Sequence, residues 1–127
     1  MLESLNLIAF LSTTRPAESK EFYGEKLGLL FMGEDANFLI FDSNGIVLRI
    51  QKVKSFTPAT TTALGWEVSD LIHEVDDLIH AGIPMLRRDG LQQDQNGVWT
   101  SPDGTMVAWF KDPDGNILTL SEHAERV

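Results

Sequence analysis

Metal binding and proton transfer are the chemistries within reach of this 127-residue chain, through 3 histidines and 19 aspartates and glutamates. Cysteine is absent, so disulfides, thiolate catalysis and cysteine-based metal sites are excluded. The sequence shows no Ser/His/Asp or Cys/His arrangement. Its glycines fall at predicted turns and helix ends rather than in a phosphate-binding loop. Candidate chemistry therefore depends on histidines, carboxylates and arginines.

The histidines do not form a ligand set. His73 and His80 lie about two turns apart on one face of a predicted helix, opposite its apolar residues. The acidic residues around them indicate a solvent-exposed face. His123 follows the last predicted strand. We therefore expect none of the three to bind a metal.

The charge balance limits the possible partners. Lysine and arginine total 10 against the 19 acidic residues, which gives a net charge of −9. Such a chain repels phosphate backbones and anionic membranes, so we expect neither nucleic acid nor a membrane as a partner. The N-terminus lacks a basic segment, and the apolar stretch 7–11 is too short for a signal peptide or a membrane span, which favours a cytoplasmic protein.

One pattern of elements occurs twice along the chain. Residues 42–50 (DSNGIVLRI) return as residues 112–120 (DPDGNILTL). Asn44-Gly45 and Asp114-Gly115 supply the positive φ that a tight turn between strands needs, so each copy is predicted to contain a hairpin. Each copy begins with a short apolar strand and a helix. The first helix is predicted from Pro16 to near Gly28, and the second from an N-cap at Ser69 to Gly82.

This repeat predicts an α+β fold, in which two tandem βαβββ modules form one domain over residues 1–127. Module 1 covers about 1–52, a linker covers 53–62, and module 2 covers about 63–123. With 43% apolar residues the chain can form a hydrophobic core. The polar stretch from Leu91 to Pro102 predicts either a loop over a pocket or a long hairpin connection.

Three stretches together resemble one family: residues 21–29 (EFYGEKLGL), 65–70 (GWEVSD) and 109–116 (WFKDPDGN). They resemble the vicinal-oxygen-chelate superfamily, also called the glyoxalase/bleomycin-resistance/dioxygenase superfamily. The resemblance implies mixed sheets that curl around a ligand cleft, usually within a homodimer.

The resemblance also implies four strand positions at which the enzymes of the family hold a divalent metal. These positions fall on Ile8, Arg49, Ala63 and Thr119, and the residues on either side of them carry no imidazole or carboxylate. A divalent cation needs several such donors, and a guanidinium repels it. We therefore expect no metal and no other cofactor.

Arg49 is the most informative of these residues. Strand alternation directs it to the cleft face, where a buried guanidinium needs a partner. That partner is either an internal acid such as Glu67 or a bound carboxylate, phosphate or enolate. We also place Phe10, Trp99 and Trp109 at the cleft, although aromatic residues on strands are more often part of a core.

These residues predict metal-independent binding, or sequestration, of a small aromatic or anionic compound, as in bleomycin-resistance proteins. Phe10, Trp99 and Trp109 would stack on the ligand, and Arg49 would fix its polar end. One alternative is a metal-dependent lyase or ring-cleaving dioxygenase of the same superfamily. Another is a metal-free enzyme with Glu67 as base and Arg49 as electrostatic stabiliser. No catalytic residue is assigned, and exposed sheet edges predict a homodimer.

Overall fold

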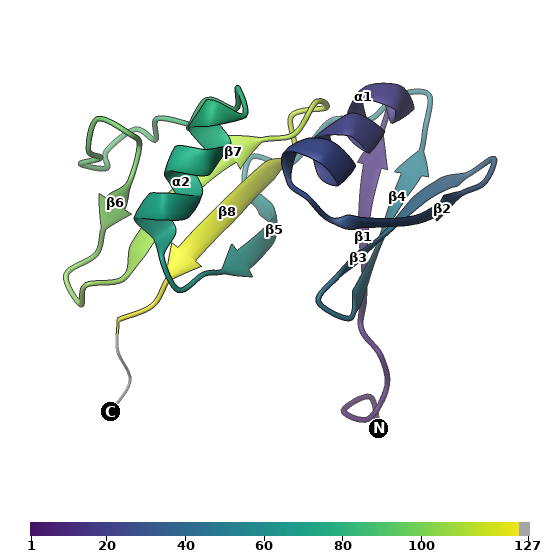
Figure 1. Ribbon diagram of the computed structural model, residues 1–127, viewed down its shortest axis with the longest axis horizontal. Helices are drawn as coiled ribbons and strands as arrows, with labels where there is room; N and C mark the ends of the chain where they lie inside the picture. The colour runs from purple at the N-terminus through teal and green to yellow at the C-terminus, as the bar shows by residue number, and fades with distance from the viewer. Residues whose placement is uncertain (125–127) are drawn as a thin grey trace. The chain divides into compact units, whose positions relative to one another are not determined.

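The computed structural model describes residues 1–124, which form two compact units. The first unit is Met1–Pro58, and the second begins at Ala59. The first contains β1 (Ile8–Thr13), α1 (Pro16–Glu21), the π-helix η1 (Phe22–Lys26), β2 (Leu30–Glu34), β3 (Phe38–Ser43) and β4 (Ile46–Lys52). The second contains β5 (Thr62–Glu67), α2 (Leu71–His80), β6 (Trp99–Thr100), β7 (Met106–Lys111) and β8 (Ile117–Glu122) (Figure 1).

Each unit has a four-stranded mixed sheet with the same strand order. The first sheet runs β1-β4-β3-β2, and the second runs β5-β8-β7-β6. The first strand of each unit pairs in parallel with its last strand, while the remaining pairs are antiparallel. A parallel pair needs a crossover connection, which includes the helix in both units. The predicted α+β fold of two tandem βαβββ modules is therefore confirmed.

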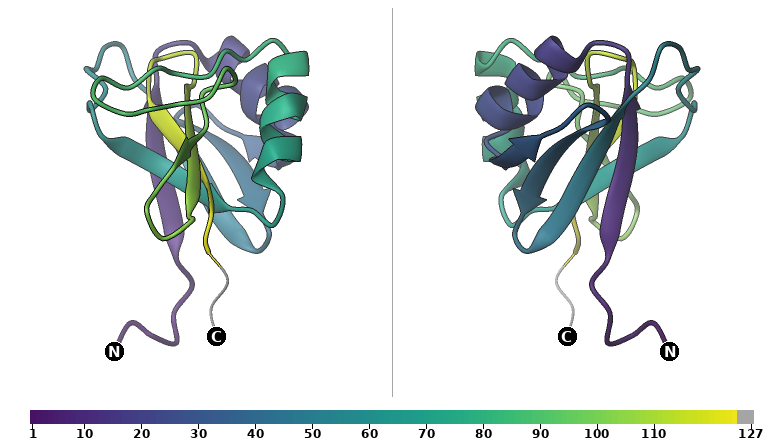
Figure 2. Two further views of the ribbon diagram at one scale, coloured as in Figure 1. Left: turned by 90° about the vertical axis from the view of Figure 1, so that its left-hand side faces the viewer. Right: turned by 90° about the vertical axis from the view of Figure 1, so that its right-hand side faces the viewer.

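The helical segment of each unit covers one face of its own sheet (Figure 2). Alternate residues of the strands are buried against it: Leu11, Leu39, Phe41, Leu48 and Ile50 in the first unit, and Ala108, Phe110, Leu118 and Leu120 in the second. Side chains alternate along a strand, so the residues between these point to the opposite side. We call that opposite side the far face of each sheet.

A π-helical turn ends the helical segment of the first unit. The Leu27 backbone N–H donates to the Phe22 carbonyl, which is the wider spacing of a π-helix. Tyr23 is fully buried, with its ring centroid 5.1 Å from that of Phe22 and 6.0 Å from that of Phe41. The extra residue per turn thus brings two consecutive aromatic side chains into the core.

The two hairpin turns differ, although their sequences are similar. Asn44 and Gly45 have φ angles of 49° and 88°, so both residues adopt the predicted positive φ. In the second copy Gly115 has a φ of 93°, but Asp114 is not among the described residues with positive φ. The Asp112 carboxylate instead accepts from the backbone N–H groups of Asp114 and Asn116, which fixes a longer turn.

Two boundaries of the second unit differ from the sequence predictions. The N-cap of α2 is Asp70 rather than Ser69, because the Asp70 carboxylate accepts from the His73 backbone N–H at 3.2 Å. Strand β5 begins at Thr62, the last residue of the predicted linker. Within residues 1–124, none of the helices has both the length and the apolar character needed to span a membrane.

Candidate functional site

Three predicted site residues of the first unit share the far face of its sheet. Leu11 is buried on the helix side, whereas Ile8 and Phe10 are 43% and 61% exposed. Phe10 is the Cα partner of Arg49 in the β1–β4 pair. The alternation predicted from the sequence for Ile8, Phe10 and Arg49 is therefore confirmed, and their role in a site stays a prediction.

Arg49 lies at the centre of this group. Its Cα is paired with Phe10 on one side and with Ile40 on the other. The guanidinium Cζ lies 5.6 Å from the centroid of the Phe38 ring, and the Phe10 ring meets Phe38 edge-on at a centroid distance of 6.4 Å. The cation is thus held between aromatic and aliphatic side chains.

The Arg49 Nε atom is buried and has no hydrogen-bond partner among the described residues. Arg49 also forms no salt bridge with any residue of the first unit. Asp35 is close enough for Arg49 to add a small Coulombic contribution to its lowered pKa, but the two side chains do not pair. The predicted pairing with Glu67 involves the other unit and stays a prediction.

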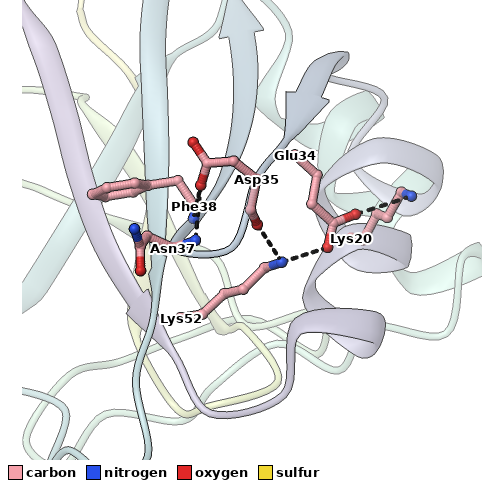
Figure 3. A network of polar contacts seen from close by, with 6 residues as sticks. All are labelled: Lys20, Glu34, Asp35, Asn37, Phe38 and Lys52. Atoms are coloured by element: carbon pink, nitrogen blue, oxygen red, sulfur yellow. Dashed lines mark hydrogen bonds and ion pairs between the residues drawn. The ribbon is translucent and has the colours of Figure 1, made fainter.

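A polar network at the β2–β3 turn positions Phe38, the ring beneath Arg49 (Figure 3). One Asp35 carboxylate oxygen accepts from the backbone N–H groups of Asn37 and Phe38, both at 2.8 Å. The Lys52 ammonium donates to the Glu34 carboxylate and to the Asp35 carbonyl, both at 2.7 Å. These contacts connect β4 to the turn and fix the start of β3.

The same contacts keep the acids of the turn ionised. The hydrogen bond from Lys52 lowers the pKa of Glu34, with a further contribution from Lys20. The backbone N–H groups of Asn37 and Phe38 lower the pKa of Asp35. Both carboxylates are therefore already committed to partners other than Arg49.

The far face of the second sheet carries the two predicted tryptophans. Ala108 and Phe110 are buried on the helix side, so Trp109 between them points to the far face. The ring centroids of Trp99 and Trp109 are 6.4 Å apart, with the planes inclined at 38°. The structure thus brings Trp99 and Trp109 together, and their predicted role in stacking on a ligand stays a prediction.

Sequence reasoning missed Arg88, which also lies beside Trp109. Its guanidinium Cζ is 5.5 Å from the centroid of the Trp109 ring. Arg88 belongs to the connection between α2 and β6, where no strand or helix periodicity fixes a side-chain direction. The sequence offered one indication that Arg88 could lie near the tryptophans, namely its position before Trp99 in a polar loop.

The remaining predicted residues of the second unit lie along β5 and β8. Thr119 is the Cα partner of Trp109, and its hydroxyl is 2.6 Å from that of Thr62. Ala63 is exposed, next to the irregularity that separates Thr62 from Leu64. Glu67 is exposed at the end of β5 and lines an open hollow with His123 and Glu122.

Comparison with known structures shows which fold this is. A glyoxalase/bleomycin resistance protein/dioxygenase superfamily member from Sphaerobacter thermophilus aligns with a TM-score of 0.74 and 19% identity, over 97% of this chain and 100% of that one. A glyoxalase family protein from Enterococcus faecalis aligns with a TM-score of 0.69 and 23% identity, over 96% and 100% of the two chains. A lactoylglutathione lyase from Agrobacterium tumefaciens aligns with a TM-score of 0.69 and 16% identity, over 96% of each chain. This is the glyoxalase/bleomycin resistance protein/dioxygenase fold.

The resemblance noted in the sequence is thus confirmed at the level of the fold. The sequence itself matches no family model and no curated protein sequence. At these sequence identities, the structural neighbours share only the glyoxalase fold with this chain. The function of the site must therefore be inferred from the residues of this chain.

The residues of this glyoxalase fold do not suit a divalent metal at the four positions implied by the resemblance. They present two aliphatic side chains, a guanidinium and the hydroxyl of Thr119, which is already paired with Thr62. No group of three or more His, Asp or Glu residues within residues 1–124 could hold a metal ion. The donor chemistry therefore does not fit the family's metal.

The histidines of α2 lie on its solvent-exposed face, as predicted. His73 and His80 are exposed and pair with Asp77 and Asp76 one turn away. A hydrogen bond with the Asp76 carbonyl raises the pKa of His80, and the Asp76 charge adds to this effect. His123 is also exposed, next to Ser121.

Proposed function

We propose that this protein binds a small, planar, anionic compound without a metal and thereby sequesters it. The observation that carries the proposal is the buried Arg49 Nε, which faces no acceptor among the described residues and lies in a guanidinium stacked on Phe38. An unsatisfied buried donor costs about 1–3 kcal/mol, and more when it is charged. A bound carboxylate or related anion removes that cost.

Three features support an external anion as the partner of Arg49. Its neighbours on the strands, Phe10 and Ile40, are apolar. The nearby acids Glu34 and Asp35 already accept hydrogen bonds from Lys52 and from backbone N–H groups. A planar guanidinium also presents paired N–H donors whose geometry matches a carboxylate.

Aromatic surfaces supply the second half of the proposal. Phe10 and Phe38 flank Arg49 in the first unit, while Trp99 and Trp109 form an inclined pair in the second. Small-molecule sites combine such apolar surfaces with a few polar anchors. The ligand class that suits both features is an aromatic or anionic compound bound by stacking and by charge.

A metal-dependent lyase is the second candidate, because one structural neighbour is a lactoylglutathione lyase. Ile8, Arg49, Ala63 and Thr119 argue against it, since they offer no imidazole or carboxylate. A metal-free enzyme with Glu67 as base is a third hypothesis. It requires turnover of the compound that binds, whereas sequestration requires that the compound be recovered unchanged.

The test is a calorimetric titration of the chelator-free protein with a panel of aromatic carboxylates and their neutral amides. Sequestration predicts that carboxylates bind, that the amides bind more weakly, and that chromatography recovers each ligand intact. Elemental analysis should find no stoichiometric divalent ion. One tightly bound ion per chain, or conversion of the ligand, would overturn the proposal. Cell fractionation tests the cytoplasmic location that we propose for this activity.

A further inference from the structure

Arg87 and Arg88 are adjacent in the chain, yet the structure uses them differently. The Arg87 guanidinium donates to the carbonyls of Asp94 and Gln95 at 2.6 and 2.8 Å, so it holds the loop before β6. Arg88 is half-buried, and its guanidinium makes no hydrogen bond or ion pair with a described residue. Its one described contact is the face of Trp109.

The loop that carries Arg88 is fixed by internal hydrogen bonds. The Gln93 side chain accepts from the Arg88 backbone N–H at 2.7 Å and donates to the carbonyls of Leu86 and Gly97 at 2.9 and 2.7 Å. The Leu86 backbone N–H in turn donates to the Trp109 carbonyl at 2.8 Å. Arg88 therefore starts from a backbone that is attached to β7 beside Trp109.

Trp99 and Trp109 leave apolar surface next to this cation. Both are half-buried, and their planes are inclined at 38° rather than stacked. An open hollow of about 650 Å³ adjoins Trp99 on the side of Gln93 and Asp94, and its lining includes neither Arg88 nor Trp109. Two indoles on the far face of one sheet, and beside them a guanidinium without a hydrogen bond to a described residue, are the groups that recognise an aromatic anion.

We propose that Arg88, Trp99 and Trp109, all of the second unit, form a binding subsite for planar aromatic carboxylates. The aromatic body would stack against the indoles, and the carboxylate would take paired hydrogen bonds from the Arg88 guanidinium. A single cation suits a singly charged carboxylate better than a phosphate dianion, in a chain whose net charge is −9. This inference rests on the proposed function, because it specifies the ligand class.

The experiment uses the full chain labelled with 5-fluorotryptophan. The chain has three tryptophans, so the labelled protein gives three fluorine NMR signals. The probes are 2-naphthoate and its neutral counterpart 2-naphthamide. We expect 2-naphthoate to shift the Trp99 and Trp109 signals, while Trp66, on the helix side of β5, serves as the internal reference. Binding of 2-naphthoate should weaken at least about tenfold in Arg88→Gln, which loses a charged hydrogen-bond donor.

Two matched variants separate this subsite from the rest of the protein. Lys54→Gln removes the same charge from an exposed position of the first unit and should leave the affinity at Trp99 and Trp109 unchanged. Arg49→Gln should leave the tryptophan shifts in place. If Arg88→Gln does not fold, the wild-type preference for 2-naphthoate over 2-naphthamide at Trp99 and Trp109 decides the question.

Each remaining outcome is decisive. Equal shifts with both probes, or an unchanged affinity in Arg88→Gln, would overturn the subsite. Calorimetric binding that depends on Arg49 without any shift of Trp99 and Trp109 would overturn it as well, yet leave the proposed function standing. Shifts that depend on Arg88 but not on Arg49 would confirm the subsite, and calorimetry of Arg49→Gln then tests the Arg49 anchor on its own.

Discussion

The guanidinium of Arg49 lies over the ring of Phe38, 5.6 Å from its centroid, and presents a buried Nε that no acceptor within residues 1–124 satisfies. Phe38 is held in turn by the β2–β3 turn, where Asp35 accepts its backbone N–H. The cation is therefore preorganised by its own unit before any ligand arrives. Preorganisation lowers the entropic cost of binding, which is why this pair leads to the first prediction.

Replacing Arg49 by Gln should cost about 2 kcal/mol or more of the binding free energy for an aromatic carboxylate, because a charged pair is lost. Isothermal titration calorimetry measures this loss. Lys54→Gln removes the same charge from an exposed position of the first unit and is the matched control. Unchanged affinity, together with a large loss of thermal stability in Arg49→Gln, would favour an internal partner instead.

Phe10→Ala should weaken binding of the same ligand by about 1 kcal/mol, since a stacked aromatic pair contributes roughly that amount. The free energy of unfolding should change little, because Phe10 is already 61% exposed. Ile46→Ala is the control. Ile46 is also exposed, but strand alternation places it on the same side as Leu48 and Ile50, which is the helix side of the sheet. The prediction fails if both variants change the affinity equally.

The β2 edge should contribute to a homodimer. Leu30 and Met32 are 62% and 60% exposed on a strand with no neighbour on its outer side in the first sheet. Lysine on an edge strand opposes pairing, so Leu30→Lys with Met32→Lys should convert a dimer to a monomer in sedimentation equilibrium. Ile72→Lys, on the exposed side of α2, should leave the dimer intact. A monomeric wild-type chain would contradict the prediction.

Gly97 should tolerate substitution worse than Gly90, although both have positive φ, of 87° and 81°. A left-handed conformation costs a non-glycine residue about 1–2 kcal/mol, which applies to both alanine variants. At Gly97 the added Cβ would also lie 2.8 Å from the Met85 Cβ, whereas at Gly90 it meets nothing within 4 Å. Thermal unfolding of the two variants measures the difference, and equal melting temperatures would count against the loop geometry.

The β2–β3 turn should lose stability in acid. The pKa of Asp35 lies below the ordinary value of about 3.9 because backbone N–H groups bond its ionised form. Its stabilising contribution is thus complete above that ordinary value and is lost as the pH falls through the lowered pKa. The stability gap between wild type and Asp35→Ala should be constant near neutrality and narrow at low pH. The stability difference between Asp35→Asn and Asp35→Ala should stay constant over the same pH range, because neither side chain titrates.

The sequence determined the pattern of elements and the faces of the strands. The two copies of one motif predicted two βαβββ modules, and alternation placed Phe10 and Arg49 opposite Leu11. These predictions succeed because turn chemistry and the two-residue period of a strand are local properties of the chain. The absence of imidazole or carboxylate at the four strand positions is likewise a property of the sequence alone.

Tertiary structure alone decided how individual side chains meet. Arg88 reaches Trp109 because Gln93 and Leu86 fix the loop through hydrogen bonds to distant backbone groups, which no local pattern encodes. The choice of Asp70 over Ser69 as N-cap depends on which carboxylate or hydroxyl meets the His73 N–H. Such contacts depend on where the chain returns after a loop, whereas periodicity reports only the side of an element on which a residue lies.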